Sequence, residues 1–372
     1  MTSLGLLVDQ LFSAAPGGMG TYIRQLIPAL SAADPSLGVT LFHARFGTQA
    51  PEPWMGRYQV EELSWPIRRL YPSWALARRP ALPSPLDSID LIHSPVPAAV
   101  PPTGQGQRLV VTVHDLAFIV HPELYPVQWR LMYRTGLFRA VREADAIITP
   151  SRHTAEDLTR RSRIPAGRIH VVPLAASLPA GTSDIDETLA RLKVRSPYVL
   201  FVGTLEPRKN VVRLVRAYRR LASRGAPHTL VLAGPMGWHH QALMRELAPE
   251  APGEIVLTGT TSAADLDALY RGASLLIYPS LYEGFGLPVL EAMARGVPCV
   301  VSIASSLPEV AGEAALPVDP RSVAGLAEAM ERIVNDRELA ARLSQAGMVR
   351  ASRFSWEETA RRTLEVYKHT MA

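Results

Sequence analysis

The stretch Glu283-Gly-Phe-Gly-Leu-Pro-Val-Leu-Glu291 closely follows a short apolar run, Leu275–Tyr278, that is typical of a buried strand. Pro288 suits the first position of a helix, so the sequence predicts a strand, a glycine-containing loop and a helix in succession. Glu283 is then expected on the loop and Glu291 in the first helical turn. Repetition of such a unit is typical of α/β folds.

The loop and the helix start of this stretch favour anion binding. The N–H groups of Phe285–Leu287 would lack partners within the helix, and the small residues Gly284 and Gly286 would let a ligand approach the backbone. Glu283 and Glu291 could accept hydrogen bonds from hydroxyl groups. A phosphate cradle beside hydroxyl acceptors suits a sugar nucleotide, which carries a diphosphate between a ribose and a second sugar.

The length of the chain predicts two domains. Its 372 residues exceed the size, roughly 250–300 residues, at which one hydrophobic core stops growing. Strand and helix patterns alternate in both halves, which favours class α/β with two doubly wound parallel sheets. Ala175–Ser183 is small, polar and proline-bearing, as in linkers, so we place the boundary near residue 178. The expected strands are Leu4–Val8, Val39–Phe42, Ile89–Ile92, Leu109–Val113, Ala146–Thr149, Tyr198–Val202, Thr229–Ala233, Glu254–Leu257, Leu275–Tyr278 and Pro298–Ile303.

The composition narrows the class of protein. Apolar residues make up 47% and charged residues 20% of the chain, with no run of about 18 apolar residues that would span a membrane. The net charge of +5 suits anionic partners, but the basic residues form no nucleic-acid module, so we expect no nucleic acid partner. The N-terminus lacks the basic region of a signal peptide, and the lone Cys299 predicts a buried structural thiol. We therefore expect a cytoplasmic protein.

The glycine-rich segment Pro16–Gly20 is the first of three loops that are expected at the carboxyl ends of strands, where ligands bind in open α/β sheets. It could let a bulky ligand approach the backbone, or it could be a plain tight turn. The spacing of Gly17, Gly18 and Gly20 does not match the Gly-x-Gly-x-x-Gly register. A dinucleotide-dependent dehydrogenase is therefore disfavoured.

The second loop, Gly203–Asn210, separates the strand Tyr198–Val202 from a helix that Asn210 is expected to cap. Arg208 and Lys209 then lie beside a helix N-terminus, where the helix dipole disfavours cations. Two cations there cost stability unless an anion bridges them, and a diphosphate is the expected anion.

The third loop begins with His114 and Asp115. The imidazole of His114 could donate a hydrogen bond to a sugar hydroxyl or a leaving phosphate, with Asp115 orienting it, or it could be a satisfied structural histidine. The adjacent His239 and His240 would point in different directions on a helix, so we expect no metal site.

Four motifs resemble the retaining glycosyltransferases of family four. They are Gly-Gly-Met-Gly-Thr-Tyr (residues 17–22), Val-His-Asp-Leu-Ala-Phe (113–118), Gly-Thr-Leu-Glu-Pro-Arg-Lys-Asn (203–210) and Tyr-Glu-Gly-Phe-Gly-Leu-Pro-Val-Leu-Glu (282–291). The resemblance covers essentially the whole chain. It implies a GT-B fold, in which two Rossmann-like domains face each other across a cleft. Residues 1–178, joined by the C-terminal helix 356–372, would form the acceptor-side domain, and residues 179–355 would bind the nucleotide-sugar donor.

The resemblance also implies roles for residues at matching positions. Arg208 and Lys209 would bind and neutralise the leaving diphosphate, Glu283 would contact hydroxyls of the donor sugar, and Glu291 would hold the ribose. Gly18 would approach the phosphates from the other domain.

Further residues would line the same site. His114 would lie near the donor sugar and Ser151 at a helix start. The remaining donor-binding candidates are backbone positions: Gly203, Gly284, Phe285, Gly286 and Leu287.

The reaction so implied is transfer of a glycosyl group with retained anomeric configuration, without a metal or other cofactor. Negative charge grows on the leaving diphosphate, where Arg208, Lys209 and a helix N-terminus would stabilise it. We expect front-face attack by the acceptor hydroxyl, so Glu283 is not a nucleophile, although it would be one in a two-carboxylate glycosidase. His-Asp-Leu-Ala-Phe and Ala-Gly-Pro-Met-Gly-Trp (residues 233–238) look most like members that add mannose from GDP-activated donors in cell-surface polysaccharide assembly.

The acceptor is a carbohydrate or a lipid-linked molecule in this interpretation. Residues 54–79 combine aromatic residues with arginines and prolines, a pattern that could rest on an anionic bilayer at the inner face of the plasma membrane or be an ordinary folded loop. Two other functions stay open at this point: a nucleotide-sugar epimerase of the same fold, and a noncatalytic sugar-nucleotide sensor.

Overall fold

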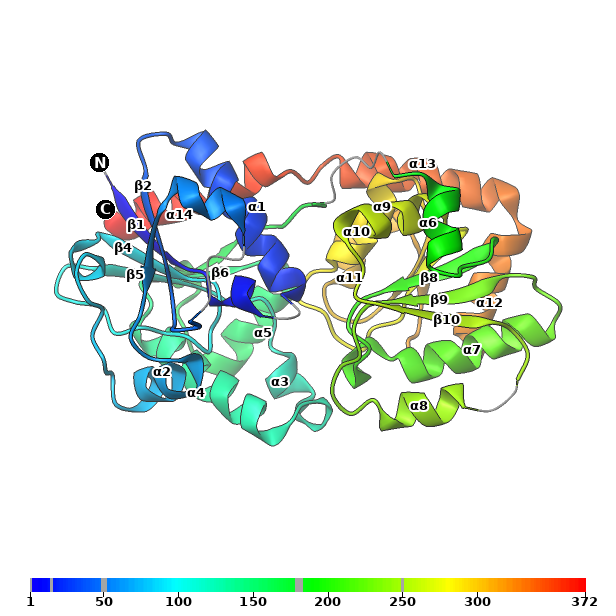
Figure 1. Cartoon of the computed structure of the whole chain (residues 1–372), viewed down its shortest axis with the longest axis horizontal. Helices are drawn as coiled ribbons and strands as arrows, with labels where there is room; N and C mark the ends of the chain where they lie inside the picture. The colour runs from blue at the N-terminus through cyan, green and yellow to red at the C-terminus, as the bar shows by residue number, and fades with distance from the viewer. Residues whose placement is uncertain (1, 14–15, 48–51, 178–182, 249–250) are drawn as a thin grey trace. The chain divides into compact units, whose positions relative to one another are not determined.

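The computed structural model describes residues 2–13, 16–47, 52–177, 183–248 and 251–372. They form two compact units, Met1–Leu174 with Trp356–Ala372, and Ala175–Ser355 (Figure 1). The boundary follows Leu174, whereas the sequence predicted it near residue 178. Residues 178–182 of the predicted linker lie outside the described ones.

The first unit is built on a seven-stranded parallel sheet with strand order β3-β2-β1-β4-β5-β6-β7. Its strands are β1 (Ser3–Leu7), β2 (Gly38–His43), β3 (Gln59–Glu62), β4 (Leu91–Ser94), β5 (Arg108–Thr112), β6 (Ala146–Thr149) and β7 (Ile169–Val171). Its helices are α1 (Gly17–Ala33), α2 (Ile67–Leu76), α3 (Ala117–Val120), α4 (Val127–Glu143), α5 (Arg152–Ser162) and α14 (Trp356–Met371). Helix α14 closes this unit by packing against α1.

The second unit is built on a six-stranded parallel sheet with strand order β10-β9-β8-β11-β12-β13. Its strands are β8 (Tyr198–Val202), β9 (Thr229–Ala233), β10 (Ile255–Gly259), β11 (Leu275–Tyr278), β12 (Cys299–Ser302) and β13 (Leu316–Val318). Its helices are α6 (Ile185–Arg191), α7 (Val211–Ser223), α8 (Gln241–Leu247), α9 (Ala263–Gly272), α10 (Leu287–Ala294), α11 (Leu307–Ala311), α12 (Val323–Asn335) and α13 (Arg337–Ala351). Short 3-10 helices are present in both units, at Asp9–Phe12, Pro53–Arg57, Leu86–Ser88, Pro122–Leu124, Ala166–Arg168, Pro207–Lys209 and Gly312–Ala314.

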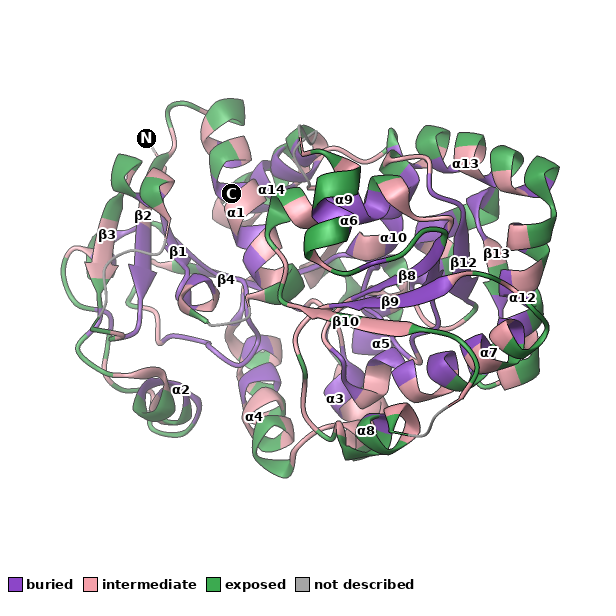
Figure 2. Ribbon diagram, turned by 45° about the vertical axis from the view of Figure 1, so that its right-hand side comes forward, coloured by how far each residue is buried: buried purple, intermediate pink, exposed green. Residues whose placement is uncertain are grey.

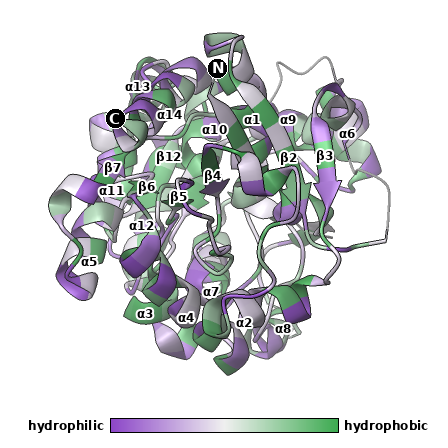
Figure 3. Cartoon of the chain, turned by 90° about the vertical axis from the view of Figure 1, so that its left-hand side faces the viewer, coloured by the Kyte–Doolittle hydropathy of each residue, from purple (hydrophilic) through white to green (hydrophobic). Residues whose placement is uncertain are grey.

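Parallel strands that are buried on both faces explain the continuous apolar runs of the sequence. Strands β8 and β9 are buried along their whole length (Figure 2). Apolar residues likewise dominate β6 and β12 (Figure 3). The two doubly wound α/β domains predicted from the sequence are confirmed.

Several predicted boundaries differ from the structure. Strand β4 begins at Leu91 instead of Ile89, because the Asp90 carboxylate accepts hydrogen bonds from the N–H and hydroxyl groups of Ser3 before pairing starts. The short edge strands β3, β7 and β13 were not predicted. The glycines expected in a loop lie instead in the first turn of α1, where the Gly20 N–H donates to the Pro16 carbonyl.

Candidate functional site

The candidate site lies where the strand order of the second sheet reverses. Strand β8 pairs with β9 on one side and with β11 on the other, so the chain leaves β8 and β11 in opposite directions. Two loops meet at such a switch point, the general ligand-binding position in open α/β sheets. One is Gly203–Asn210, after β8, and the other is Pro279–Gly286, after β11.

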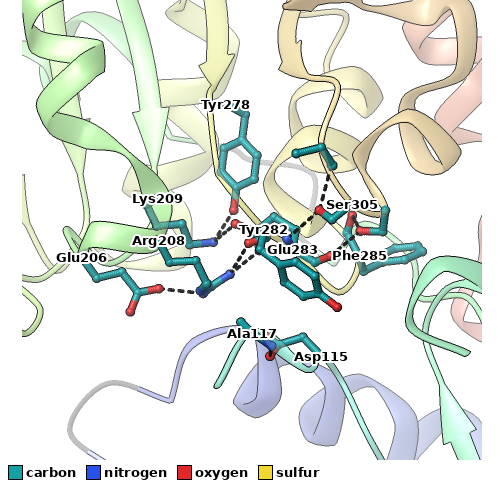
Figure 4. A network of polar contacts seen from close by, with 12 residues as sticks. Asp115, Ala117, Glu206, Arg208, Lys209, Tyr278, Tyr282, Glu283, Phe285 and Ser305 are labelled. Atoms are coloured by element: carbon teal, nitrogen blue, oxygen red, sulfur yellow. Dashed lines mark hydrogen bonds and ion pairs between the residues drawn. The ribbon is translucent and has the colours of Figure 1, made fainter. Parts of the chain in front are cut away.

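Arg208 links these two loops. Its Nη1 atom donates to Glu283 Oε2 and to the Tyr282 carbonyl, both at 2.9 Å, and its Nη2 atom donates to Glu206 Oε1 at 2.6 Å (Figure 4). The Leu281 N–H also donates to the Arg208 carbonyl at 2.9 Å. Side chain and backbone therefore hold the guanidinium in one place.

Lys209 completes the ion-pair network. Its ammonium donates to Glu283 Oε1 at 2.7 Å and to the Tyr278 hydroxyl at 2.5 Å. Lys209 is only 8% exposed, so its ammonium is buried together with these partners. The anion that bridges the two cations is Glu283, a carboxylate of the chain itself.

The charge of Glu283 is stabilised strongly by its neighbours. Burial raises the pKa of its carboxyl, but Arg208 and Lys209 outweigh burial and hold that pKa at about 2. Each carboxylate oxygen already accepts a hydrogen bond from one cation. Such a carboxylate is a poor nucleophile, and it must share or exchange its partners when an anionic ligand binds to the cations.

Glu206 is a member of the network that the sequence interpretation missed. It is 4% exposed, and burial raises the pKa of its carboxyl although Arg208 opposes this. Its Oε1 atom accepts from Arg208, while its Oε2 atom has no hydrogen-bond partner among the described residues. Glu206 therefore fixes Arg208 and leaves one buried acceptor.

A turn after β12 holds the backbone of the Glu283 loop. The Ser305 hydroxyl accepts from the Glu283 N–H at 2.7 Å, and the Ser306 hydroxyl lies 2.9 Å from the carbonyl oxygens of Glu283 and Phe285. Ser305 has φ of 56°, a left-handed conformation that is uncommon outside glycine and is here held by these bonds. The turn that follows β12 thus helps to hold the Glu283 loop, together with the loops after β8 and β11.

The start of α10 presents the predicted cradle. The N–H groups of Phe285, Gly286 and Leu287 have no acceptor among the described residues, although all three residues are buried. Gly286 has φ of 128°, which L side chains rarely adopt, and a Cβ atom there would lie 2.7 Å from the Leu307 side chain, so the position favours glycine. Buried N–H groups of this kind at a helix start favour an anion.

Glu291 lies in the second turn of α10, because the helix already begins at Leu287 and not at Pro288. Its carboxyl accepts from the Tyr270 hydroxyl at 2.9 Å and from the Ser177 hydroxyl at 3.3 Å. Burial raises its pKa, which these hydrogen bonds oppose. Both hydroxyl donors belong to the second unit, so the side chain is held within its own unit.

Two further positions of the β8 loop have structural roles. A Cβ atom on Gly234 would lie 2.2 Å from the Gly203 carbonyl oxygen, so the loops after β8 and β9 can approach only with glycine there. Asn210 holds the predicted N-cap position of α7, but its side chain does not cap the helix. Its amide instead donates to the carbonyls of Pro279 and Pro320, which ties the β8 loop to its neighbours.

His114 belongs to the first unit and lies two residues beyond the end of β5. Burial lowers its pKa to about 4, and a hydrogen bond to the Pro95 backbone opposes this shift. Its Nε2 atom has no partner among the described residues, so the other nitrogen makes the Pro95 bond and Nε2 carries the lone pair of a neutral ring. The geometry therefore favours hydrogen-bond acceptance from a hydroxyl over the predicted donation. Asp115 accepts from the Ala117 N–H at 2.9 Å instead of orienting the ring.

The other candidates of the first unit occupy helix starts. Gly18 is exposed in the first turn of α1. Ser151 caps α5 as predicted, with its hydroxyl accepting from the Thr154 N–H.

The segment 54–79 is more buried than its composition indicates. Trp74 is 1% exposed and donates to the Pro80 carbonyl, and Tyr71 donates to Asp9 at 2.7 Å. These two aromatic rings pack in the core and are not available for a bilayer contact, whereas Trp65 of the same segment is 39% exposed. In the part of the chain that the structure describes, no helix is long and apolar enough to cross a membrane.

Two predictions about metal and thiol chemistry can be compared with the structure. Over the described ranges, no group of three or more His, Cys, Asp or Glu residues could hold a metal ion. His240, one of the two adjacent histidines, places its Nδ1 atom within hydrogen-bond distance of the Gly237 carbonyl oxygen, at 2.7 Å. Cys299 is fully buried in β12, and burial raises its pKa, which confirms the predicted structural thiol.

The lowered pKa of Glu283 predicts an acid-sensitive fold. Its folded pKa of about 2 is below the ordinary value of 4.5, so its contribution to stability is complete above pH 4.5 and is lost as the pH falls towards 2. The shift corresponds to about 3 kcal/mol of unfolding free energy. The free energy of unfolding, measured with denaturant across this pH range, should fall more steeply for the native chain than for Glu283→Gln. Parallel curves would contradict the ion-pair geometry.

Models of two glycosyltransferase families match the chain. The family described as Glycosyltransferase Family 4 matches residues 16–178, and the family described as Glycosyl transferases group 1 matches residues 185–350. The O-antigen chain mannosyltransferase B of Escherichia coli is 35% identical over 271 residues, which cover 70% of each chain.

Solved structures of glycosyltransferases share the fold. Sucrose-phosphate synthase from Thermosynechococcus elongatus superimposes with a TM-score of 0.75 over 99% of both chains, at 22% identity. HepE of Anabaena, solved in complex with UDP-glucose, gives a TM-score of 0.73 over 99% of this chain and 100% of that chain, at 19% identity. Two Rossmann-like domains of the GT-B type are thus the fold of this chain.

Proposed function

The chain belongs to glycosyltransferase family 4, and we propose that it transfers a sugar from a nucleoside-diphosphate donor to a hydroxyl acceptor with retention of configuration. The candidate donor is GDP-mannose, and the acceptor belongs to cell-surface polysaccharide or glycolipid assembly. Similarity to an O-antigen mannosyltransferase supports this choice, and HepE supports a nucleotide sugar as the ligand class. Family membership favours transfer over the epimerase and sensor alternatives.

The observation that carries the proposal is the buried cation pair Arg208 and Lys209 beside the start of α10. Together with the N–H groups of Phe285–Leu287, the two cations supply hydrogen-bond donors at the switch point of one unit. A diphosphate carries the charge and the oxygen atoms that these donors require. Glu291, held by Tyr270, would then accept the ribose hydroxyls.

The proposed mechanism uses this chain's own cations to stabilise the leaving group. As the bond between the sugar and the phosphate stretches, negative charge grows on the diphosphate within reach of Arg208 and Lys209. No metal is required in this scheme. Glu283, with each oxygen bonded to a cation, contacts donor hydroxyls and does not form a covalent glycosyl intermediate. In the first unit, the neutral His114 ring can accept a hydrogen bond from a hydroxyl group.

Calorimetric titration with GDP, UDP, ADP and their sugars tests the proposal. We expect GDP and GDP-mannose to bind most tightly, and Glu291→Ala to weaken the binding of every nucleotide by tenfold or more, because charged hydrogen bonds typically contribute about 1.5–3 kcal/mol. Preference for UDP or ADP would show that the donor carries another nucleotide, while the proposed site would still stand. Absence of any nucleotide binding by the native chain, or unchanged affinity of Glu291→Ala, would contradict the site itself.

A further inference from the structure

Glu206 is the more weakly held of the two carboxylates in the ion-pair network. Its Oε1 atom accepts from Arg208 at 2.6 Å, while its buried Oε2 atom has no hydrogen-bond partner among the described residues. Figure 4 shows one carboxylate oxygen turned towards Arg208 and the other turned away. Glu283, by contrast, accepts a hydrogen bond from a cation on each oxygen. A buried charge with an oxygen left unpaired is costly, so Glu206 is the site of the network that a proton would relieve most.

The loop after β9 holds the backbone beside Glu206. The Leu205 N–H donates to the Pro235 carbonyl at 2.9 Å, and the Gly237 N–H donates to the Leu205 carbonyl at 3.2 Å. A Cβ atom on Gly237 would lie 3.1 Å from Glu206 Cβ, so the two loops pack closely. His240, a titratable residue of the β9 loop, places its Nδ1 atom 2.7 Å from the Gly237 carbonyl oxygen. Glu206 is therefore held in the site by its backbone as well as by its ion pair.

The network is electrically balanced without a ligand. Arg208 and Lys209 bring two positive charges, and Glu206 and Glu283 bring two negative charges. Burial raises the pKa of the nearby Tyr278 hydroxyl well above its ordinary value, so this group stays neutral. The diphosphate of a donor adds negative charge beside the cations and upsets this balance. Excess charge of one sign costs much more in a buried site than in water.

We propose that binding of the donor diphosphate is coupled to the uptake of one proton by Glu206. The proton comes from solvent and forms an O–H bond at Oε2, while Oε1 keeps its hydrogen bond from Arg208. One negative charge of the network is thereby removed as the ligand brings its own. The neutral carboxyl also becomes a hydrogen-bond donor, which suits a site that holds phosphate oxygens. This inference rests on the proposed function, because its ligand is the diphosphate of a nucleotide sugar.

The other carboxyls of the site are less suited to take the proton. Burial raises the pKa of Glu283, but the neighbouring cations outweigh burial and hold that pKa at about 2. Burial also raises the pKa of Glu291, yet each of its oxygens accepts from a hydroxyl group, one from Ser177 and the other from Tyr270. For Glu206, burial raises the pKa in the same direction, and one oxygen is unpaired. A proton can bind there without breaking a hydrogen bond.

Calorimetric titration of the full chain with GDP-mannose, in Pipes and in Tris at the same neutral pH, tests the proposal. These buffers differ in their heat of ionisation, so a difference in the observed heat counts the protons taken up. Both phosphates of GDP-mannose are esterified on each side, so the ionisation near pH 6 of a phosphate monoester is absent and the proton must go to the protein. We expect uptake of about one proton for each ligand bound. The association constant should fall by up to about tenfold per pH unit above neutral pH. UDP-glucose is titrated in parallel in case the nucleotide is UDP.

Glu206→Gln is the decisive variant, because glutamine keeps an acceptor for Arg208 and places an N–H donor where the protonated Oε2 would lie. It should bind the donor without proton uptake and with an affinity that does not change between pH 7 and pH 9. Two matched controls should keep the uptake of the native chain. Glu291→Gln changes the other carboxyl of the site whose pKa burial raises. Asp9→Asn changes a buried carboxyl of the first unit, where burial raises the pKa to about 6.

The possible results separate this inference from the proposed function. Binding of GDP-mannose or UDP-glucose by the native chain without proton uptake overturns the inference and leaves the donor site standing. Uptake that persists in Glu206→Gln also overturns it, and loss of uptake in Glu291→Gln alone would assign the proton to Glu291. Absence of binding of either donor would contradict the donor site and the inference together. Thermal unfolding of Glu206→Gln without ligand shows whether the variant is folded, and the native chain alone decides whether a proton is taken up.

Discussion

Replacing Lys209 by methionine should lower turnover of the donor by roughly 10²–10³-fold, the usual cost of removing one preorganised group that stabilises developing charge. The ammonium is fixed by Glu283 and Tyr278, so it does not have to reorganise as the diphosphate leaves. Methionine keeps the apolar stem of the side chain and removes only the charge. Release of nucleoside diphosphate from saturating donor measures the effect.

The same change should lower the free energy of unfolding by about 3–5 kcal/mol, because the carboxylates of Glu206 and Glu283 are left with Arg208 alone. The double variant Lys209→Met/Glu283→Gln removes one charge of each sign. It should regain most of the lost stability and none of the lost turnover. Recovery of turnover in the double variant would show that Lys209 acts only by supporting the fold.

The arrangement of strands and loops could be predicted from the sequence because its signals are local. The run Leu275–Tyr278, the following glycines and Pro288 together indicate a strand, a loop and a helix, and the structure contains β11 and α10 there. The same kind of signal located β6, β8 and β9 at their observed bounds. Short edge strands such as β7, with three residues, carry too few residues for a pattern.

The partners within the site could not be predicted in the same way, because they depend on which strands are neighbours. Arg208 and Glu283 are 75 residues apart and meet only because β8 pairs with β11. The sequence showed two cations in need of an anion, but not that the chain supplies one. Tyr278 could have been suspected, since a hydroxyl at the end of an apolar strand points to the same sheet edge. Ser305 and Ser306 gave no such signal.

Replacing Glu283 by glutamine should tighten the binding of free nucleoside diphosphate by roughly tenfold, or about 1.4 kcal/mol, because the ligand no longer competes with a carboxylate for Arg208 and Lys209. Without ligand, the variant should lose about 3–5 kcal/mol of unfolding free energy, since Lys209 is left buried with no opposite charge at bonding distance. Excess diphosphate should restore part of this loss, which thermal unfolding with and without GDP measures. Glu313→Gln, an exposed carboxylate in the same unit, is the control and should change neither quantity.

The sugar on the donor separates the two roles proposed for Glu283. If this carboxylate also accepts hydrogen bonds from the donor sugar, Glu283→Gln should gain affinity for GDP but gain little or lose affinity for GDP-mannose. The ratio of the two affinities then isolates the sugar contact from the electrostatic competition, which both ligands share. Equal gains in affinity for both ligands would show that Glu283 makes no contact with the sugar. Weaker binding of GDP itself would show that the diphosphate does not use the cations that Glu283 holds.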